Sequence, residues 1–178
     1  MALGLEIATE LIGAVKAGDV EQVRQLIRAD ANNNSAPEWG LCRLLGIAAA
    51  HGNLDLANAL LAIGADLNPT DRHFVEPLWY ATANGHVDIV KCLLRAGART
   101  KGCSGRNMFL PAVVSGNAEL ISVFLDYGAN PNEEFRGWLT PLELAMRLGH
   151  QKAANLLRNA GAEQTAILEK VEKVFMQA

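Results

Sequence analysis

Apolar residues recur at helical spacing in five separate segments of the chain. These segments read VEQVRQLI, LDLANALL, VDIVKCLL, AELISVFL and QKAANLLR. The repetition of Leu, Ile, Val or Ala every three or four residues predicts an amphipathic helix in each segment, with one face buried. A shorter, Ala-rich segment precedes each one: IATELIGAV, LLGIAAA, PLWYATA, FLPAVV and PLELAM. We expect these to form a second set of helices, whose small residues allow close packing.

Glycines divide these helices at a regular period. A turn glycine separates the two helices of each unit, at Gly18, Gly52, Gly85, Gly116 and Gly149, with spacings of 34, 33, 31 and 33 residues. A second glycine follows the longer helix, at Gly64, Gly97, Gly128 and Gly161, and Asp30 occupies this place in the first unit. Such a period is typical of stacked repeats, in which each unit buries its apolar face only against its neighbours.

The pattern therefore predicts an all-α solenoid of helix-turn-helix units joined by long loops. Five units span residues 1–163, at about 5–34, 35–68, 69–101, 102–132 and 133–163. Residues 164–178 carry apolar side chains at helical spacing, and we interpret them as a C-terminal capping helix over the last unit. The alternative is that this helix docks on a partner or on a second copy of the chain.

The segment EPLWYATANGHVDIVKCLLRAGA resembles the ankyrin repeat, whose first helix opens on T-P-L-H-x-A. Thr140-Pro141-Leu142 matches that opening most closely, and the resemblance covers about residues 8–162. The first two units lack the Thr-Pro opening. The fourth carries Pro111 inside its first helix and follows a loop that is two residues shorter. We therefore expect the joint between the third and fourth units to depart from regular stacking.

His86 and His150 each follow a turn glycine. The resemblance implies that these side chains order the turn between two helices by hydrogen bonding. A catalytic histidine would need a nucleophile or a base partner within hydrogen-bond reach, and local spacing provides none. The motifs HExxH, GxSxG and the P-loop do not occur in the sequence. We accordingly expect no enzyme, no cofactor and no metal site.

Composition limits the classes of partner. The net charge is −3, from 16 basic and 19 acidic residues, which gives no general attraction to nucleic acid or to anionic membranes. A local basic run, Lys91 to Arg106, contains no acid, but nucleic-acid binding would need a longer continuous track.

The three cysteines show no CxxC spacing and predict reduced thiols, with Cys92 buried in the core. The first residues include no basic leader, and no apolar run approaches the roughly 18 residues of a membrane span. We expect a cytoplasmic protein.

The loops are where the units cease to resemble one another, so they hold the information specific to this chain. The resemblance implies that partners bind on the concave side, formed by the first helices and the loop tips. The predicted partner-binding residues are Trp39, His51, Arg72, His73, Phe74, Tyr80, Asn84, Arg106, Phe135, Arg136, Trp138 and Arg147. For the aromatic loop residues, the alternative is packing against a neighbouring loop. Of the adjacent Trp79 and Tyr80, we expect one in the core and one on the concave wall.

These observations predict non-covalent recognition of another protein by a rigid surface, with the chain a monomer when unbound. One interpretation is a scaffold or adaptor. The alternative is a stoichiometric inhibitor, such as an immunity protein or an antitoxin that covers the active site of a toxin. The acidic N-terminal half is compatible with a basic target of that kind.

Overall fold

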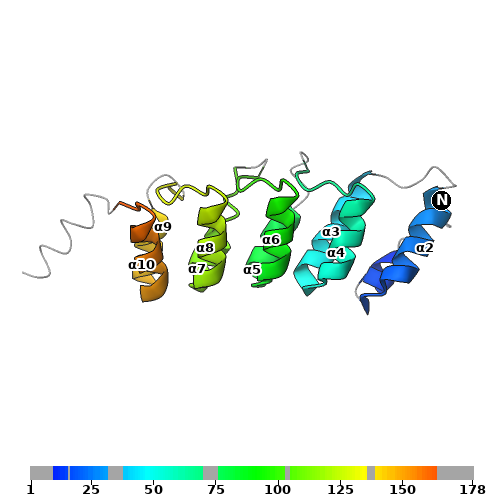
Figure 1. Cartoon of the computed structure of the whole chain (residues 1–178), viewed down its shortest axis with the longest axis horizontal. Coiled ribbons are helices and arrows are strands. Elements are labelled where there is room, and N and C mark those ends of the chain that lie inside the picture. The colour runs from blue at the N-terminus through cyan, green and yellow to red at the C-terminus, as the bar shows by residue number, and fades with distance from the viewer. Residues whose placement is uncertain are drawn as a thin grey trace, which may run out of the picture. The chain divides into compact units, whose positions relative to one another are not determined.

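The computed structural model describes residues 10–15, 17–31, 38–69, 76–102, 105–135 and 139–163, with the backbone alone at 27–31 and 38–39. The predicted all-α repeat fold is confirmed (Figure 1). Residues 10–15 are helical and precede the named helices α2 (Val20–Ala31), α3 (Glu38–His51), α4 (Leu54–Ala62), α5 (Pro77–Ala83), α6 (Val87–Arg95), α7 (Leu110–Ser115), α8 (Ala118–Asp126), α9 (Pro141–Arg147) and α10 (Gln151–Asn159). The proposed capping helix, 164–178, lies outside the described residues. No helix in the part described is both long and apolar enough to cross a membrane.

The chain divides into two compact units, residues 1–108 and 109–178, so the division falls between the third and fourth helix pairs. In the first unit, α3 packs on α4 and α5, α5 packs on α6, and α4 contacts both α2 and α6. The fully buried side chains come from the predicted apolar faces: Leu45, Leu56, Leu60, Leu78, Ile89 and Leu93. Burying each of these side chains contributes about 1.5–3 kcal/mol relative to leaving it exposed. A single helix pair could not bury its apolar face alone, so this contribution depends on the neighbouring pairs.

The second unit is built in the same way, with α7 against α8 and α9, and α10 against α8 and α9. The Phe109 and Phe124 rings lie 5.5 Å apart in its core. Thr140 caps α9 in a capping box, because its Oγ1 accepts from the Glu143 amide and Glu143 Oε2 accepts from the Thr140 amide. Pro111 is the second residue of α7. It therefore lies in the first turn, where a missing N–H costs no helical hydrogen bond, and α7 simply begins later than expected.

Two turn glycines are covered by a histidine of the following helix pair. Gly52 and Gly116 have φ of 75° and 65°, and a Cβ at either would lie 2.8 Å from an atom of the His86 ring or 2.5 Å from one of the His150 ring. His86 Nε2 donates to the Ala50 carbonyl at 3.1 Å, and His150 Nε2 donates to the Val114 carbonyl at 3.0 Å. The histidines thus form hydrogen bonds near a turn, as the resemblance implied, but the turn belongs to the preceding repeat, so each histidine joins two repeats.

An asparagine in the loop after α4, and another after α8, makes an equivalent connection. Asn68 donates to the Gly97 carbonyl at 3.0 Å and accepts from the Arg99 amide at 2.7 Å. Asn132 donates to the Gly161 carbonyl at 2.9 Å and accepts from the Glu163 amide at 2.8 Å. Both asparagines follow the second glycine of their repeat by four residues. We call these two residues the asparagine clamps.

Candidate functional site

At the end of three first helices, the last residue or the C-cap carries an exposed polar side chain that is hydrogen-bonded to its own helix. His51 Nδ1 donates to the Ile47 carbonyl at 2.9 Å, and Asn84 Nδ2 donates to the Tyr80 carbonyl at 2.8 Å. In the second unit, the Ser115 hydroxyl donates to the Ala112 carbonyl at 3.1 Å. All three side chains are exposed. Their orientation is therefore set before any partner arrives, as a recognition surface requires.

Tyr80 is the exposed aromatic residue of this surface. It is 37% exposed, and its ring lies over Gly46 of the neighbouring helix α3. A Cβ at Gly46 would be 3.4 Å from the Cδ2 and Cε2 atoms of the ring. Because Gly46 has no side chain, the ring can pack closely against α3. Trp79 is half-buried beside it. We expected one of these two aromatics in the core, but neither is fully buried, and the placement of Tyr80 on the concave wall stays a prediction.

The Arg106 side chain contacts residues of its own unit, Trp79 and Glu76. Its guanidinium carbon lies 5.1 Å from the centre of the Trp79 ring, and Nη1 lies 3.7 Å from Oε2 of Glu76, a carboxylate that is only 4% exposed. The Arg106 carbonyl accepts from the Gly102 amide at 2.8 Å, and Lys101 forms an antiparallel bridge with Asn107. Arg106 therefore fastens its loop to the start of α5, and part of its charge is already compensated.

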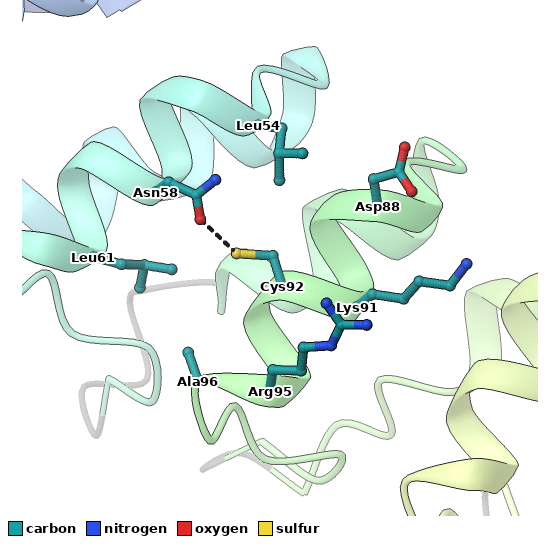
Figure 2. A pocket seen from close by; sticks show the side chains of 8 residues that line it. All are labelled: Leu54, Asn58, Leu61, Asp88, Lys91, Cys92, Arg95 and Ala96. Atoms are coloured by element: carbon teal, nitrogen blue, oxygen red, sulfur yellow. Dashed lines mark hydrogen bonds between the residues drawn. The ribbon is translucent and has the colours of Figure 1, made fainter.

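Three expectations about individual residues need correction. Phe135 is only 7% exposed, and its amide donates to the Leu139 carbonyl at 2.7 Å. Its ring therefore packs inside the protein, as the alternative for the aromatic loop residues stated, and is not accessible to a partner. Trp39 belongs to α3, not to a loop tip, because the helix begins at Glu38. Cys92 is half-buried and is not the core residue that its place among the apolar residues of α6 had suggested. Its side chain is directed at α4 instead (Figure 2).

Other predicted site residues lie beyond what the structure describes: the Trp39 side chain, Arg72, His73, Phe74, Arg136 and Trp138. Arg147 is exposed at the end of α9, in the unit 109–178. Of the predicted set, His51 and Tyr80 lie on the packed helices α3 and α5, and Asn84 is the C-cap of α5. We call these three residues the first-helix surface.

Sequence reasoning missed a groove between the second helices α4 and α6, shown in Figure 2. Its volume is about 660 Å³. It is lined by Leu54, Asn58, Leu61, Asp88, Lys91, Cys92, Arg95 and Ala96. The Cys92 thiol donates to Asn58 Oδ1 at 3.1 Å, and burial raises the pKa of this thiol although Arg95 opposes the shift. In the sequence, the feature that could have indicated this groove is Asn58, a polar residue among the apolar positions of α4.

The comparisons with known proteins agree with this repeat architecture. A family model for ankyrin repeats, in three copies, matches residues 11–102. The putative ankyrin repeat protein YahD of Escherichia coli is 31% identical over 79% of this chain and 73% of its own length. Potassium channel AKT2/3 of Arabidopsis thaliana is 26% identical over 90% of this chain, and the putative ankyrin repeat protein FPV014 of Fowlpox virus is 28% identical over 86%. The matched regions are 20% and 36% of those two longer proteins. The count of five repeats stays a prediction.

Proposed function

Because the chain belongs to the ankyrin-repeat family, we propose that it is a non-enzymatic recognition module, a scaffold or adaptor that binds another protein. Ankyrin repeats are in general protein–protein interaction modules, and their stacked helices present extended binding surfaces. We place the binding residues on the first-helix surface, His51, Tyr80 and Asn84, and in the loops that flank it. Arg147 is proposed as a contact of the second unit.

The observation that carries this proposal is the fixed geometry of the first-helix surface. Ordering a flexible side chain on binding costs about 0.5–1.5 kcal/mol. The hydrogen bonds from His51 to Ile47 and from Asn84 to Tyr80 reduce that cost, because these side chains are already held. Tyr80 adds a large, partly apolar ring of the kind that is enriched at binding hot spots. These side chains are therefore already oriented for contact with a partner.

The arrangement of the histidines supports a non-enzymatic role. Nε2 of His86 and of His150 each donates to a backbone carbonyl of the preceding repeat. These nitrogens hold repeats together, so they are not poised as general bases. Among the described residues, no three His, Cys, Asp or Glu side chains lie close enough together to hold a metal ion.

The proposal is tested by affinity capture of partners from the native host, followed by binding measurements with the captured protein. Tyr80→Ala should weaken binding by about 30-fold, the loss expected of a hot-spot aromatic residue of roughly 2 kcal/mol. Tyr127→Ala is the matched control, because Tyr127 is 41% exposed at the end of α8 in the other unit. Equal affinities for the two variants would contradict the first-helix assignment. Should the captured partner be an enzyme that loses activity when bound, the inhibitor alternative would replace the adaptor.

A further inference from the structure

One wall of the groove between α4 and α6 is partly apolar, because two leucines flank an asparagine there. Leu54, Asn58 and Leu61 are spaced by four and three residues along α4 and so form one stripe of that helix. Figure 2 shows this stripe facing α6, with the Cys92 thiol directed at Asn58 across the gap. All of these residues lie within the unit 1–108. The groove is on the second helices and is separate from the first-helix surface.

The opposite wall is charged, and its charges are ordered along the helix. Asp88 stands in the first turn of α6, Lys91 comes one turn later, and Arg95 stands in the last turn. Exposed cations continue beyond the helix at Arg99 and Lys101, and the sequence contains no acid from residue 91 to 106. Lys91 and Arg95 therefore make this part of the α6 wall cationic, opposite the partly apolar wall of α4, although the chain as a whole is acidic.

We propose that the α4–α6 groove binds an acidic amphipathic segment of a partner protein. Apolar side chains of that segment pack on Leu54 and Leu61, and its carboxylates lie beside Lys91 and Arg95. Charge complementarity fixes the direction, because Asp88 repels carboxylates from the other end of the groove. This is a second contact surface, and it does not depend on the first-helix surface being correct.

The same features disfavour a nucleic acid as the occupant. A phosphate backbone requires cations along a continuous track, and it gains nothing from an apolar wall. Asp88 at one end of the groove would repel phosphates and so shortens the stretch open to a phosphate backbone. An acidic protein segment uses both walls, since apolar contact supplies affinity while the charges supply orientation.

The test uses the full chain and a capped synthetic peptide of about 15 residues, because shorter isolated helices are marginal in water. The peptide carries leucines at helical spacing with glutamates beside them, and a second peptide has lysine in place of every glutamate. Affinity is measured by fluorescence anisotropy. The site is read from the iodoacetamide alkylation rate of Cys92, followed by peptide mapping. We expect the glutamate peptide to bind and to slow Cys92 alkylation in proportion to occupancy, and the lysine peptide to do neither.

Charge variants decide whether the groove itself is responsible. Lys91→Gln and Arg95→Gln should each weaken the glutamate peptide by about two- to fivefold, as expected for partly exposed ion pairs, and Asp88→Asn should strengthen it. Arg43→Gln is the matched control: it removes one charge from an exposed position on α3, so peptide affinity should stay unchanged. Circular dichroism verifies that each variant folds. Tyr80→Ala should also leave the peptide affinity unchanged, which separates this site from the first-helix surface.

Several results would overturn the inference. One is absence of glutamate-peptide binding, or binding that leaves Cys92 alkylation unaffected. Another is equal weakening by Arg43→Gln and Arg95→Gln, which would reveal a non-specific effect of net charge. A single-stranded oligonucleotide that protects Cys92 better than the peptide would identify a nucleic-acid site. Protection of Cys92 that rises with protein concentration alone would make a second copy of the chain the occupant.

Discussion

Replacement of Gly52 by alanine tests the junction between repeats most directly. Gly52 has φ of 75°, and the His86 ring covers it so closely that an added Cβ would lie 2.8 Å from Cε1 and from Nδ1. Alanine therefore introduces two separate costs. The first is backbone strain in the left-handed region, and the second is displacement of a ring whose Nε2 bonds to Ala50 at 3.1 Å.

The magnitude follows from these two terms. A residue with a Cβ in the left-handed conformation costs about 1–2 kcal/mol relative to glycine. The displaced ring loses one partly buried hydrogen bond, worth about 1 kcal/mol. Gly52→Ala should therefore lower the free energy of unfolding by about 2–3 kcal/mol in total. Gly85→Ala should cost only the strain, because Gly85 has a similar φ of 80° and a Cβ there would have no neighbour within 4 Å.

The assay is urea unfolding followed by circular dichroism, for Gly52→Ala, Gly85→Ala, His86→Ala and the double variant Gly52→Ala/His86→Ala. Once the histidine is removed, Gly52→Ala should cost no more than Gly85→Ala, so the cycle should show a coupling of about 1 kcal/mol. Equal costs for the two glycine variants, together with strict additivity in the cycle, would refute the claim that His86 acts through Gly52.

Other consequences concern single groups in the two units. Arg106→Gln should lower stability by about 1–2 kcal/mol and change the fluorescence of Trp79, because the ring loses its cation and Glu76 loses an ion-pair partner; unchanged fluorescence would contradict the contact. Burial, with smaller contributions from nearby carboxylates, raises the pKa of Cys42 from 9.0 to about 11. The unfolded chain then loses its proton first, so stability should fall as the pH rises from about 9 to 11, and Cys42→Ala should reduce this slope in urea titrations at each pH. Thr140→Ala should cost about 1 kcal/mol, whereas Thr140→Ser should keep the capping box and most of the stability.

The sequence was sufficient for the repeat fold because its signals are local. The turn glycines and the helical spacing of apolar residues report on a single helix pair, and the structure has helices wherever those signals occur among the described residues. The use of an individual side chain depends instead on the neighbouring repeat. Asn53 and His86 both follow a turn glycine and both cover the turn glycine of the preceding repeat, yet Asn53 Oδ1 also accepts from the Leu56 amide and caps its own helix, while the His86 ring bonds to Ala50. Local spacing does not distinguish these two roles.

The candidate site was predicted less completely for the same reason. Tyr80 was identified as one of two adjacent aromatic residues on a first helix, but its contact with Gly46 arises from the packing of α5 on α3. Arg106 was selected as an exposed cation of a loop, whereas the hairpin-like return of that loop brings it onto Trp79. Phe135 deviates in the same direction, because this loop residue is bridged to Leu139 and its side chain is buried. In each case a contact between segments overrides the tendency of the residue type.

The asparagine clamps lead to a last prediction about how stability is distributed. Asn68 connects the second and third helix pairs, Asn132 connects the fourth and fifth, and each clamp lies inside one compact unit. The third repeat has Lys101 at the corresponding position, and an ammonium group cannot accept the backbone N–H bond that both asparagines accept. Loss of a clamp should therefore act locally, since repeat stability is a sum over neighbouring units.

Asn68→Ala should lower amide hydrogen-exchange protection in α3 to α6 by about 1–2 kcal/mol and leave α7 to α10 unchanged, because it removes two hydrogen bonds within the first unit. Asn132→Ala should show the reverse distribution. Asn130→Ala is the control, since the Asn130 side chain accepts a local bond from the amide of Asn132 and, among the described residues, makes no bond to another repeat, so protection should fall much less. If either clamp variant lowered protection equally throughout the chain, the clamps would not be confined to their units, and the two halves would unfold as one.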